Sequence, residues 1–399
     1  MRRRRRTTRW RCAEAGVISW LDTPREADAP LAGLKVLELA RVLAGPWAGQ
    51  TLADLGADVI KVEGPGGDNT RAWGPPYIER DDGTQEAAYY HACNRGKRSI
   101  VADFGNADDL ARVKTLAADA DVLIENFLTG KLARFGLDYE SLAASNPALV
   151  YCSITGFGQT GPRRSERGYD FVIQGMSGFM ALTGEPQGEP MKHGLAISDL
   201  FCGVYASSAI QAALLMRHRT GKGQHIDMSL LDCSVSLLAN QAMALFATGE
   251  NPPRMGNEHL QVSAYGVFPV ADGEVVLAPG NDGLFRKLLE LLERRDLLDD
   301  ARFSTNAGRL TNREALRQEL SDATRQWTGE ALLARCAEAG VPAGPINALD
   351  QVFADPQVQE RGMKIELAGI PGVRSPFAFS RAKLALDRPS PRKGEHGAD

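Results

Sequence analysis

The sequence predicts an α/β protein, with a doubly wound, parallel, Rossmann-like sheet in a large domain and a smaller α+β domain. Two observations support this fold class. Short apolar runs alternate with helical patterns from residue 34 to residue 155, and after Gly156 long helical patterns follow. The chain has 399 residues. A chain of this size buries roughly 75% of its unfolded surface, so a large core is expected.

The first elements predict a βαβ unit. Residues 34–39 have the pattern of a strand, residues 47–55 that of a short helix, and residues 57–63 that of a second strand. Such a unit implies two parallel strands joined by a right-handed crossover. The later elements continue the alternation. Further strands are expected at 99–104, 121–125 and 148–155, with helices at 108–118 and 139–144.

Beyond residue 156 the pattern is mainly helical. Long helices are expected at 171–182, 199–219 and 230–247, with a strand at 224–228. Further strands and helices are expected at 264–269, 274–278, 284–294 and 313–328. The predicted organisation is a disordered basic tail at 1–28, a large domain at 29–229, a small domain at 230–330, and a return segment at 331–399 that completes the large domain. Residues 389–399 are expected to be frayed.

The charge is unevenly distributed along the chain. The formal net charge is −4, but residues 1–11 hold seven arginines and no acid, which leaves 39 basic against 50 acidic side chains elsewhere. A body this acidic repels nucleic acid and anionic lipid, so neither is expected as a partner. The basic tip is interpreted as a removable tail, which implies a cytoplasmic protein, or a matrix protein if the tip is a transit peptide. No run approaches 18 apolar residues, so no membrane span is expected.

The cysteines and histidines give no metal or redox signal. The six cysteines form no C-x-x-C pair, and the six histidines form no short-spaced metal-binding pattern. No metal site is therefore expected. The cysteines are interpreted as reduced, mostly buried small apolar residues.

One glycine-rich motif matches a nucleotide fingerprint only in part. Residues 156–161 fit G-x-G-x-x-G and follow a predicted strand, but Pro162 and polar residues come next instead of a helix. A nucleotide-binding oxidoreductase is therefore a weak alternative. The motif is also compatible with a tight turn, or with a loop whose backbone N–H groups face an anionic or acyl ligand.

Several cations lie near the ends of predicted strands, where ligands bind in open α/β sheets. They are Arg41, Lys61, Arg71, Lys97, Arg98 and Lys131. Together they suggest phosphate binding, although each alone is more often a solvated surface charge. Asp170 lies where a loop enters a helix, and this spacing by itself is typical of a helix cap.

Several phrases together resemble the class III coenzyme A transferases. They are Arg41-Val-Leu-Ala-Gly-Pro46, Leu55-Gly-Ala-Asp-Val-Ile-Lys-Val-Glu63, Asn94-Arg-Gly-Lys-Arg-Ser99, Glu125-Asn-Phe127, Thr155-Gly-Phe-Gly-Gln-Thr-Gly-Pro162, Gly168-Tyr-Asp170 and Thr220-Gly-Lys-Gly-Gln-His-Ile-Asp227. The resemblance extends from about residue 30 to about residue 385, in the family's order. Trp73-Gly-Pro-Pro76 and Tyr151–Pro162 are most similar to transferases of the succinyl-CoA:glutarate type.

The resemblance implies an enzyme that moves CoA from an acyl-CoA thioester to a free carboxylic acid. It implies no prosthetic group, a CoA thioester as co-substrate, an interlocked homodimer, and Asp170 as the catalytic carboxylate. The residues implied to contact CoA are Arg41, Leu43, Ala44, Arg71, Asn94, Lys97, Arg98 and Lys131. Those implied to lie near the acyl group are Gly156, Phe157 and Gly158.

The chain departs from the family pattern in places. Gly64 stands where some members carry a cation, and the four-glycine lid of formyl-CoA transferases is absent. A 2-methylacyl-CoA racemase on the same fold is a second alternative, but its chemistry needs an acid/base pair. The racemases resembled here have Gly-His-Asp at the position where this chain has Gly168-Tyr169-Asp170. The missing histidine disfavours racemase activity.

Overall fold

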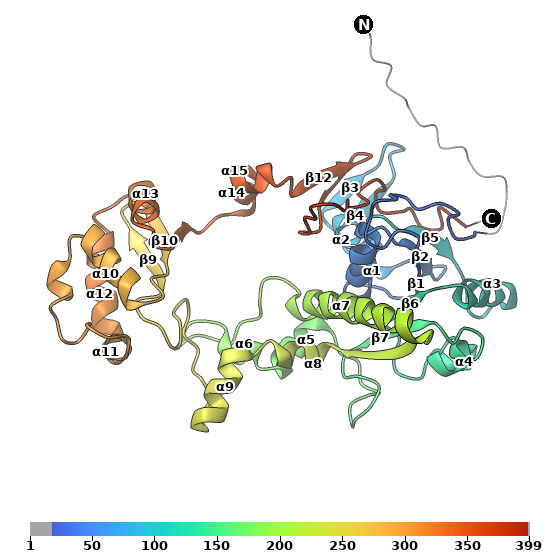
Figure 1. The fold of residues 1–399 in the computed structure, drawn as a ribbon, viewed down its shortest axis with the longest axis horizontal. Coiled ribbons are helices and arrows are strands. Elements are labelled where there is room, and N and C mark those ends of the chain that lie inside the picture. Colours follow the sequence, from blue (N-terminus) through green and yellow to red (C-terminus); the bar gives the residue numbers. More distant parts are fainter. Residues whose placement is uncertain (1–17, 398–399) are drawn as a thin grey trace, which may run out of the picture. The chain divides into compact units, whose positions relative to one another are not determined.

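The computed structural model describes residues 18–397, which form two compact units (Figure 1). The second unit consists of Ser177–His193 and Leu238–Arg361, and the first contains the other described residues. These limits differ from the predicted 230–330. Residues 331–361 belong to the second unit because α13 (Gly329–Ala339) buries Leu332 and Cys336 in its core. The helix α8 (Leu230–Ser236) stays in the first unit, where Leu230 is buried.

The first unit is built on a six-stranded sheet whose neighbouring strands are all parallel. The strand order is β5-β2-β1-β6-β7-β8. The strands are β1 (Lys35–Glu38), β2 (Asp58–Glu63), β5 (Arg98–Val101), β6 (Val122–Glu125), β7 (Val150–Thr155) and β8 (Gln224–Ser229). The chain winds outward in one direction from β1 and in the other from β6. The predicted doubly wound α/β fold is confirmed, with its topological switch point between β1 and β6.

Helices cover both faces of this sheet. The long helix α7 (Ile197–Thr220) packs on α1 (Ala44–Asp54), and Gly203 allows the contact because a Cβ there would lie 2.7 Å from the carbonyl oxygen of Ala44. A second core on the unit contains side chains of α3 (Ala107–Ala118) and α4 (Tyr139–Ala143). The shorter elements of the unit are η1 (Asn69–Ala72), β3 (Tyr77–Glu79), β4 (Gln85–Ala87), α2 (Ala88–Ala92), η2 (Ala133–Phe135), α5 (Asp170–Met176), β12 (Lys364–Leu367) and β13 (Ile370–Val373).

The helix α7 is apolar along much of its length. Within residues 18–397 it is the one single helix long and apolar enough to cross a membrane. However, its Cys202, Ala206 and Ile210 side chains are fully buried in the unit's core. This is the packing of a core helix in a globular unit.

The second unit has its own core. Its sheet is antiparallel, in the order β11-β10-β9, and Phe268, Leu277 and Leu288 are buried beneath its helices. Its elements are α6 (Phe179–Leu182), α9 (Ala239–Thr248), β9 (Gly266–Val270), β10 (Gly273–Leu277), α10 (Asp282–Leu291), η3 (Arg295–Leu297), α11 (Asn306–Thr311), α12 (Arg313–Thr324), α13, β11 (Ala343–Pro345), α14 (Leu349–Ala354) and α15 (Pro356–Glu360). The predicted smaller α+β domain is thus confirmed as a fold class.

Both described ends of the chain are more ordered than the sequence predicts. The expected disorder of 1–28 is wrong for residues 18–28, because Ile18 and Trp20 are buried in the second hydrophobic core of the first unit, together with side chains of α3 and α4. Residues 1–17 lie outside the described part. The expected fraying from 389 is wrong up to residue 397. Ser390 is buried, and the N–H of His396 donates to the carbonyl of Ser99 at 2.9 Å. The return segment thereby contacts β5, the edge strand of the sheet, whose polar backbone would otherwise be unpaired.

Candidate active site

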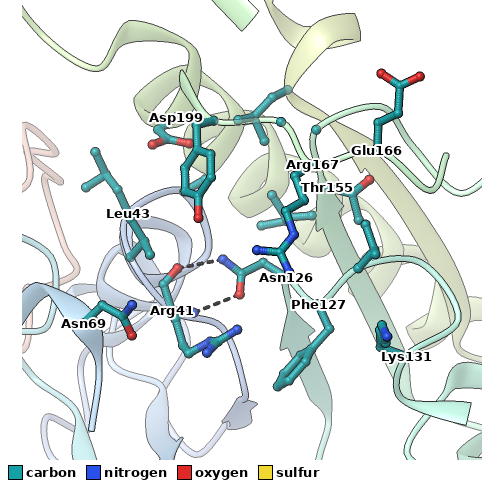
Figure 2. A pocket seen from close by; sticks show the side chains of 18 of the residues that line it. Arg41, Leu43, Asn69, Asn126, Phe127, Lys131, Thr155, Glu166, Arg167 and Asp199 are labelled. Carbon is teal, nitrogen blue, oxygen red and sulfur yellow. Dashed lines mark hydrogen bonds between the residues drawn. The ribbon is translucent and has the colours of Figure 1, made fainter. Parts of the chain in front are cut away.

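A cavity of about 510 Å³ opens at the carboxyl ends of β1, β6 and β7, at the switch point of the sheet (Figure 2). In open α/β sheets this is the place where ligands bind. The lining comes from five stretches of the first unit and from four single residues. It consists of 41–44, 126–128, 131, 134–135, 154–156, 166–169, Asn69, Asp199 and Leu230.

The loop after β1 is fixed to the loop after β6 by one side chain. The N–H of Arg41 donates to Oδ1 of Asn126 at 2.9 Å, and Nδ2 of Asn126 donates to the carbonyl of Arg41 at 2.6 Å (Figure 2). The next residue, Val42, has a φ of 72°. This left-handed conformation is strained for a β-branched residue and persists only where the surroundings impose it.

The surroundings that impose it lie behind the loop. The N–H of Val42 donates to the carboxylate of Asp68 at 3.3 Å, and the thiol of Cys93 donates to the carbonyl of Val42 at 3.4 Å. Asp68 is in turn held by the ammonium of Lys61 at 2.9 Å. Lys61 also donates to the carbonyl of Ala40, at 2.9 Å. The loop is therefore held in one conformation from within the protein.

Lys61 belongs to a fully buried charge cluster centred on Glu38. The ammonium of Lys61 lies 3.1 Å from one oxygen of Glu38, and that of Lys97 lies 2.8 Å from the other. Burial alone would lower the pKa of Lys61, but the carboxylates of Glu38 and Asp68 outweigh it and raise the pKa above its usual value. For Lys97 the burial effect dominates and lowers the pKa.

Four predicted CoA contacts therefore lie away from the pocket lining. Asn94 and Lys97 bond to each other at 2.9 Å and are fully buried. Arg98 forms an ion pair with Asp58, and Arg71 donates to Glu63 at 2.6 Å. Two causes place these side chains outside the pocket lining: the direction of β5, and ion pairs with carboxylates of the same unit.

Lys97 and Arg98 precede or begin β5, so they lie at its amino end, whereas the pocket lies at carboxyl ends. Arg71 comes after the carboxyl end of β2, but the carboxylates of Glu63 and Glu86 engage it. These three cations are thus paired with carboxylates of the first unit, and their contact with CoA stays a prediction.

Other predicted residues do line the pocket: Arg41, Leu43, Ala44, Lys131 and Gly156. Phe157 and Gly158 are not part of the lining. Phe157 packs against the first core, and the N–H of Gly158 donates to Oγ1 of Thr155 at 2.9 Å.

Four cations line the pocket, and in the described chain none of them forms an ion pair with a carboxylate. They are Arg41, Lys131, Arg134 and Arg167. The guanidinium of Arg41 lies 5.1 Å from the centre of the Phe127 ring, and that of Arg134 lies 4.5 Å from the Phe135 ring. The sequence analysis missed Arg134 and Arg167. For Arg167 a signal was present, because it stands two residues before Tyr169 in the Gly168-Tyr-Asp170 block.

Asp170, the predicted catalytic residue, is absent from the pocket lining. It is the first residue of α5, and its Oδ1 accepts the N–H groups of Ser198 at 2.8 Å and Asp199 at 3.3 Å. Its Oδ2 accepts from the amide of Gln174 at 2.6 Å. The carboxylate thus caps the amino end of α7, a different helix from its own, where the helix dipole favours a negative charge.

Two carboxylates line the pocket, Glu166, which pairs with Arg163, and Asp199, which lies in the first turn of α7 (Figure 2). Among residues 18–397 the carboxylate of Asp199 has no hydrogen-bonding or cationic partner. Burial, and after it the negative charge of Asp170, raise the pKa of Asp199 to about 7. Asp199 is thus a third functional candidate that the sequence analysis missed, after Arg134 and Arg167. A carboxylate with a strongly raised pKa in a cleft is typical of a functional site.

The loop before Asp170 is folded back on the end of β7. A Cβ on Gly156 would lie 2.5 Å from the Cα of Gly168, so the two backbones touch. The chain after Gly161 forms turns, and the next helix begins at Asp170. The helix required by a dinucleotide fingerprint is therefore missing from this loop.

Within residues 18–397 there is no group of three or more His, Cys, Asp or Glu side chains able to hold a metal ion. The five described cysteines are free and buried.

Comparison with known proteins places these observations in context. The model of CoA-transferase family III matches residues 31–397. The chain is 56% identical to succinate–glutarate CoA-transferase of Agrobacterium fabrum, over 92% of this chain and 94% of that protein. It is 40% identical to human succinyl-CoA:glutarate CoA-transferase, over 92% and 84%. A crystal structure of a CAIB/BAIF family protein from Brucella suis has a TM-score of 0.85 and 58% identity, covering 93% of this chain and 98% of that one.

Proposed function

We propose, because this chain belongs to CoA-transferase family III, that it transfers CoA from succinyl-CoA or a similar dicarboxylyl-CoA to glutarate or a similar free acid. The family and its relatives identify the chain as an acyl-CoA:carboxylate CoA-transferase, which uses a CoA thioester as co-substrate. The choice of acids rests on the names of the relatives. The observation that supports it best is a pocket that combines four cations lacking acidic partners with one carboxylate lacking a cation.

The pocket favours Asp199 over Asp170 as the nucleophile. Both oxygens of Asp170 already accept hydrogen bonds, and the residue does not line the cavity. Asp199 lines the cavity, and in the described chain its carboxylate has no hydrogen-bonding or cationic partner. The family resemblance implies Asp170 as the attacking carboxylate, and that assignment stays a prediction. On the pocket lining we propose Asp199 for this role, and the peptide experiment described below decides between the two.

The proposed reaction conserves an activated acyl group at every step. An oxygen of Asp199 attacks the thioester carbonyl, the carbon–sulfur bond breaks, and CoA leaves as a thiolate, which produces a mixed anhydride. The thiolate attacks the aspartyl carbonyl, releases the donor acid, and forms an aspartyl-CoA thioester. The acceptor carboxylate then attacks the carbonyl of this thioester, the carbon–sulfur bond breaks, and CoA thiolate leaves, which forms a second anhydride. The thiolate finally attacks the acyl carbon and regenerates Asp199. This is covalent catalysis, which divides one exchange into easier steps and needs no ATP.

Asp170 has a positioning role in this proposal. By accepting the N–H groups of Ser198 and Asp199, it holds the first turn of α7, and with it the nucleophile. Its negative charge also raises the pKa of Asp199, which makes the ionised nucleophile more basic.

CoA would bind along the loops at the switch point. The cations without acidic partners are suited to the phosphates of CoA. The strained, fixed loop at 41–44 is suited to the long pantetheine arm, which needs backbone donors. Because the loop is already ordered, little conformational entropy is lost when the ligand binds.

We also propose that two copies associate. The exposed large apolar side chains on α5 and α7 include Phe171, Val172, Val204, Tyr205 and Leu215, and Leu215 is 71% exposed. Exposed apolar surface of this kind usually marks a protein interface. Light scattering should give twice the chain mass of 43.1 kDa, whereas a monomer at micromolar concentration would contradict the proposal.

The activity is tested by mixing the purified protein with succinyl-CoA and glutarate in the absence of ATP and measuring glutaryl-CoA by chromatography. Formation of glutaryl-CoA supports the proposed function, and no product with any dicarboxylic acid contradicts it. The covalent intermediate is tested by intact mass after incubation with the thioester alone. Trypsin separates the two carboxylates, because Asp170 lies in peptide 168–192 and Asp199 in peptide 193–217. A hydroxylamine-sensitive CoA adduct on 193–217 supports Asp199, and one on 168–192 returns the role to Asp170.

A further inference from the structure

Among the four pocket cations, Arg167 differs from the others in its place on the chain. Lys131 and Arg134 follow β6, and Arg41 follows β1. Arg167 lies on the loop that leads to Asp170 and is three residues from it. A chain spans at most roughly 3.6 Å per residue, so its Cα lies within about 11 Å of that of Asp170. Asp170 in turn contacts the N–H of Asp199 at 3.3 Å. Of the four pocket cations, Arg167 is therefore the one nearest in the chain to Asp170, whose carboxylate contacts the backbone of Asp199.

Nothing in the described chain neutralises this side chain. Its acidic neighbour, Glu166, pairs with Arg163 at 3.0 Å instead. Figure 2 shows the guanidinium of Arg167 directed into the middle of the pocket, while the carboxylate of Glu166 points away from it. The contact between Gly156 and Gly168 fixes the backbone next to Arg167 against the end of β7. The side chain of Arg167 therefore starts from a fixed stretch of backbone, is exposed, and has no acidic partner in the described chain.

We propose that Arg167 binds the second, unreacting carboxylate of the dicarboxylic substrate and so sets the preference for dicarboxylic over monocarboxylic acids. This inference rests on the proposed function. In a short diacid the second carboxylate is only a few bonds from the reacting carbonyl, whereas the phosphates of CoA lie at the far end of the pantetheine arm. A guanidinium also matches a carboxylate with two parallel hydrogen bonds, which gives direction as well as charge.

The test compares two acceptors with the same chain length. Glutarate carries the second charge, and monomethyl glutarate has it masked as an ester. In a ping-pong reaction, kcat/KM for the acceptor reports on the acceptor half-reaction alone. We expect Arg167→Gln to lower the ratio of kcat/KM for glutarate over monomethyl glutarate about 10- to 100-fold, the value of a lost charged hydrogen bond. Arg167→Lys should restore part of the ratio, because lysine keeps the positive charge but cannot donate two parallel hydrogen bonds to a carboxylate.

Arg134→Gln is the matched control, since it removes another pocket cation from a different loop. It should leave the ratio within a factor of about three of wild type while raising KM for the acyl-CoA. An unchanged ratio in Arg167→Gln would overturn the inference, and so would an equal fall for both acceptors, which would assign Arg167 to CoA.

A binding measurement separates this inference from the proposed function. Glutarate should raise the thermal midpoint of wild type and should not raise that of Arg167→Gln, whether or not turnover occurs. If wild type transfers CoA to no acid, the proposed function fails, but the binding result still decides the role of Arg167. Equal stabilisation of both proteins by glutarate would refute that role.

Discussion

The side-chain amide of Asn126 pairs with the backbone of Arg41 through both its oxygen, which accepts at 2.9 Å, and its nitrogen, which donates at 2.6 Å. It thereby joins the loops on either side of the switch point. These two loops supply much of the pocket wall. A single side chain therefore controls the relative position of two ligand-binding segments that are far apart in the sequence.

Replacement of Asn126 by Ala should loosen this wall. We expect KM for the acyl-CoA to rise about tenfold, with a smaller change in kcat, because ordering the loops would then oppose binding. Asn146→Ala is the matched control. Asn146 also bridges two backbone carbonyls, those of Ala117 and Ala120, but it lies outside the pocket lining. Steady-state kinetics on both variants decide the matter, and an equal rise in KM for the two would show that the effect is only structural.

The activity should depend on the ionisation of Asp199. Its pKa is raised to about 7 by burial and by the charge of Asp170, and only the ionised form is a nucleophile. We expect kcat/KM to rise with pH and to level off above a pKa near 7. Asp199→Asn should abolish turnover. The acidic limb is measured by initial rates between pH 5 and 9, and a flat profile across this range would contradict the assignment.

The same pKa predicts an effect on stability. A folded-state pKa above the unfolded value means that the stability supplied by neutral Asp199 is present at low pH and is lost as pH rises through about 7. Asp199→Asn should therefore raise the thermal midpoint at pH 8 more than at pH 5. Calorimetry at the two pH values measures this difference. An equal gain at the two pH values would mean that Asp199 is ionised at both and would contradict the raised pKa.

The buried cluster around Glu38 should matter mainly for folding. Glu38→Gln leaves Lys61 and Lys97 with one fewer buried negative charge, and we expect a loss of about 3–5 kcal/mol of unfolding free energy. Asp119→Asn is the control, since its ion pair with Lys35 is exposed and should contribute less than about 1 kcal/mol. Urea unfolding of both variants provides the comparison, and similar losses would contradict the role of burial.

The amino-terminal boundary of the folded chain can be located by truncation. The sequence predicts that residues 1–28 form a disordered tail, but Ile18 and Trp20 are buried, and Arg25 donates to the carbonyl of Gly96 at 2.8 Å. Removal of residues 1–28 should cost about 3–6 kcal/mol through the two apolar side chains alone. Removal of 1–17 should leave these contacts intact. Thermal unfolding of the two shortened proteins distinguishes the outcomes, and equal stability would contradict the packing argument.

The family, the α/β class and part of the pocket were predictable from local sequence patterns. Short apolar runs that alternate with helical patterns identified the strands. The position of residues after strand ends, together with the family motifs, selected a set of residues that all line the cavity: Arg41, Leu43, Ala44, Lys131 and Gly156. These features depend on short segments whose conformation and place in the sheet follow from their own residues.

The surroundings of other charged residues depend on partners that are distant in the chain or that only the fold selects. Lys97 looks like a ligand-binding cation in the sequence, yet Glu38, 59 residues earlier, neutralises it inside the core. Arg167 is surrounded by polar residues in the sequence, yet its acidic neighbour Glu166 pairs with Arg163 and leaves it in the pocket.

The sequence by itself determined the fold class, the enzyme family and the loops that meet at the switch point. Only the tertiary structure decided which charges are available to a ligand, and which of two aspartates lines the pocket. The physical reason is that a charge is free or neutralised according to its neighbours in space. Asp170 and Asp199 are separated in the chain, and their different roles follow from hydrogen bonds that form only when α5 and the start of α7 are brought together.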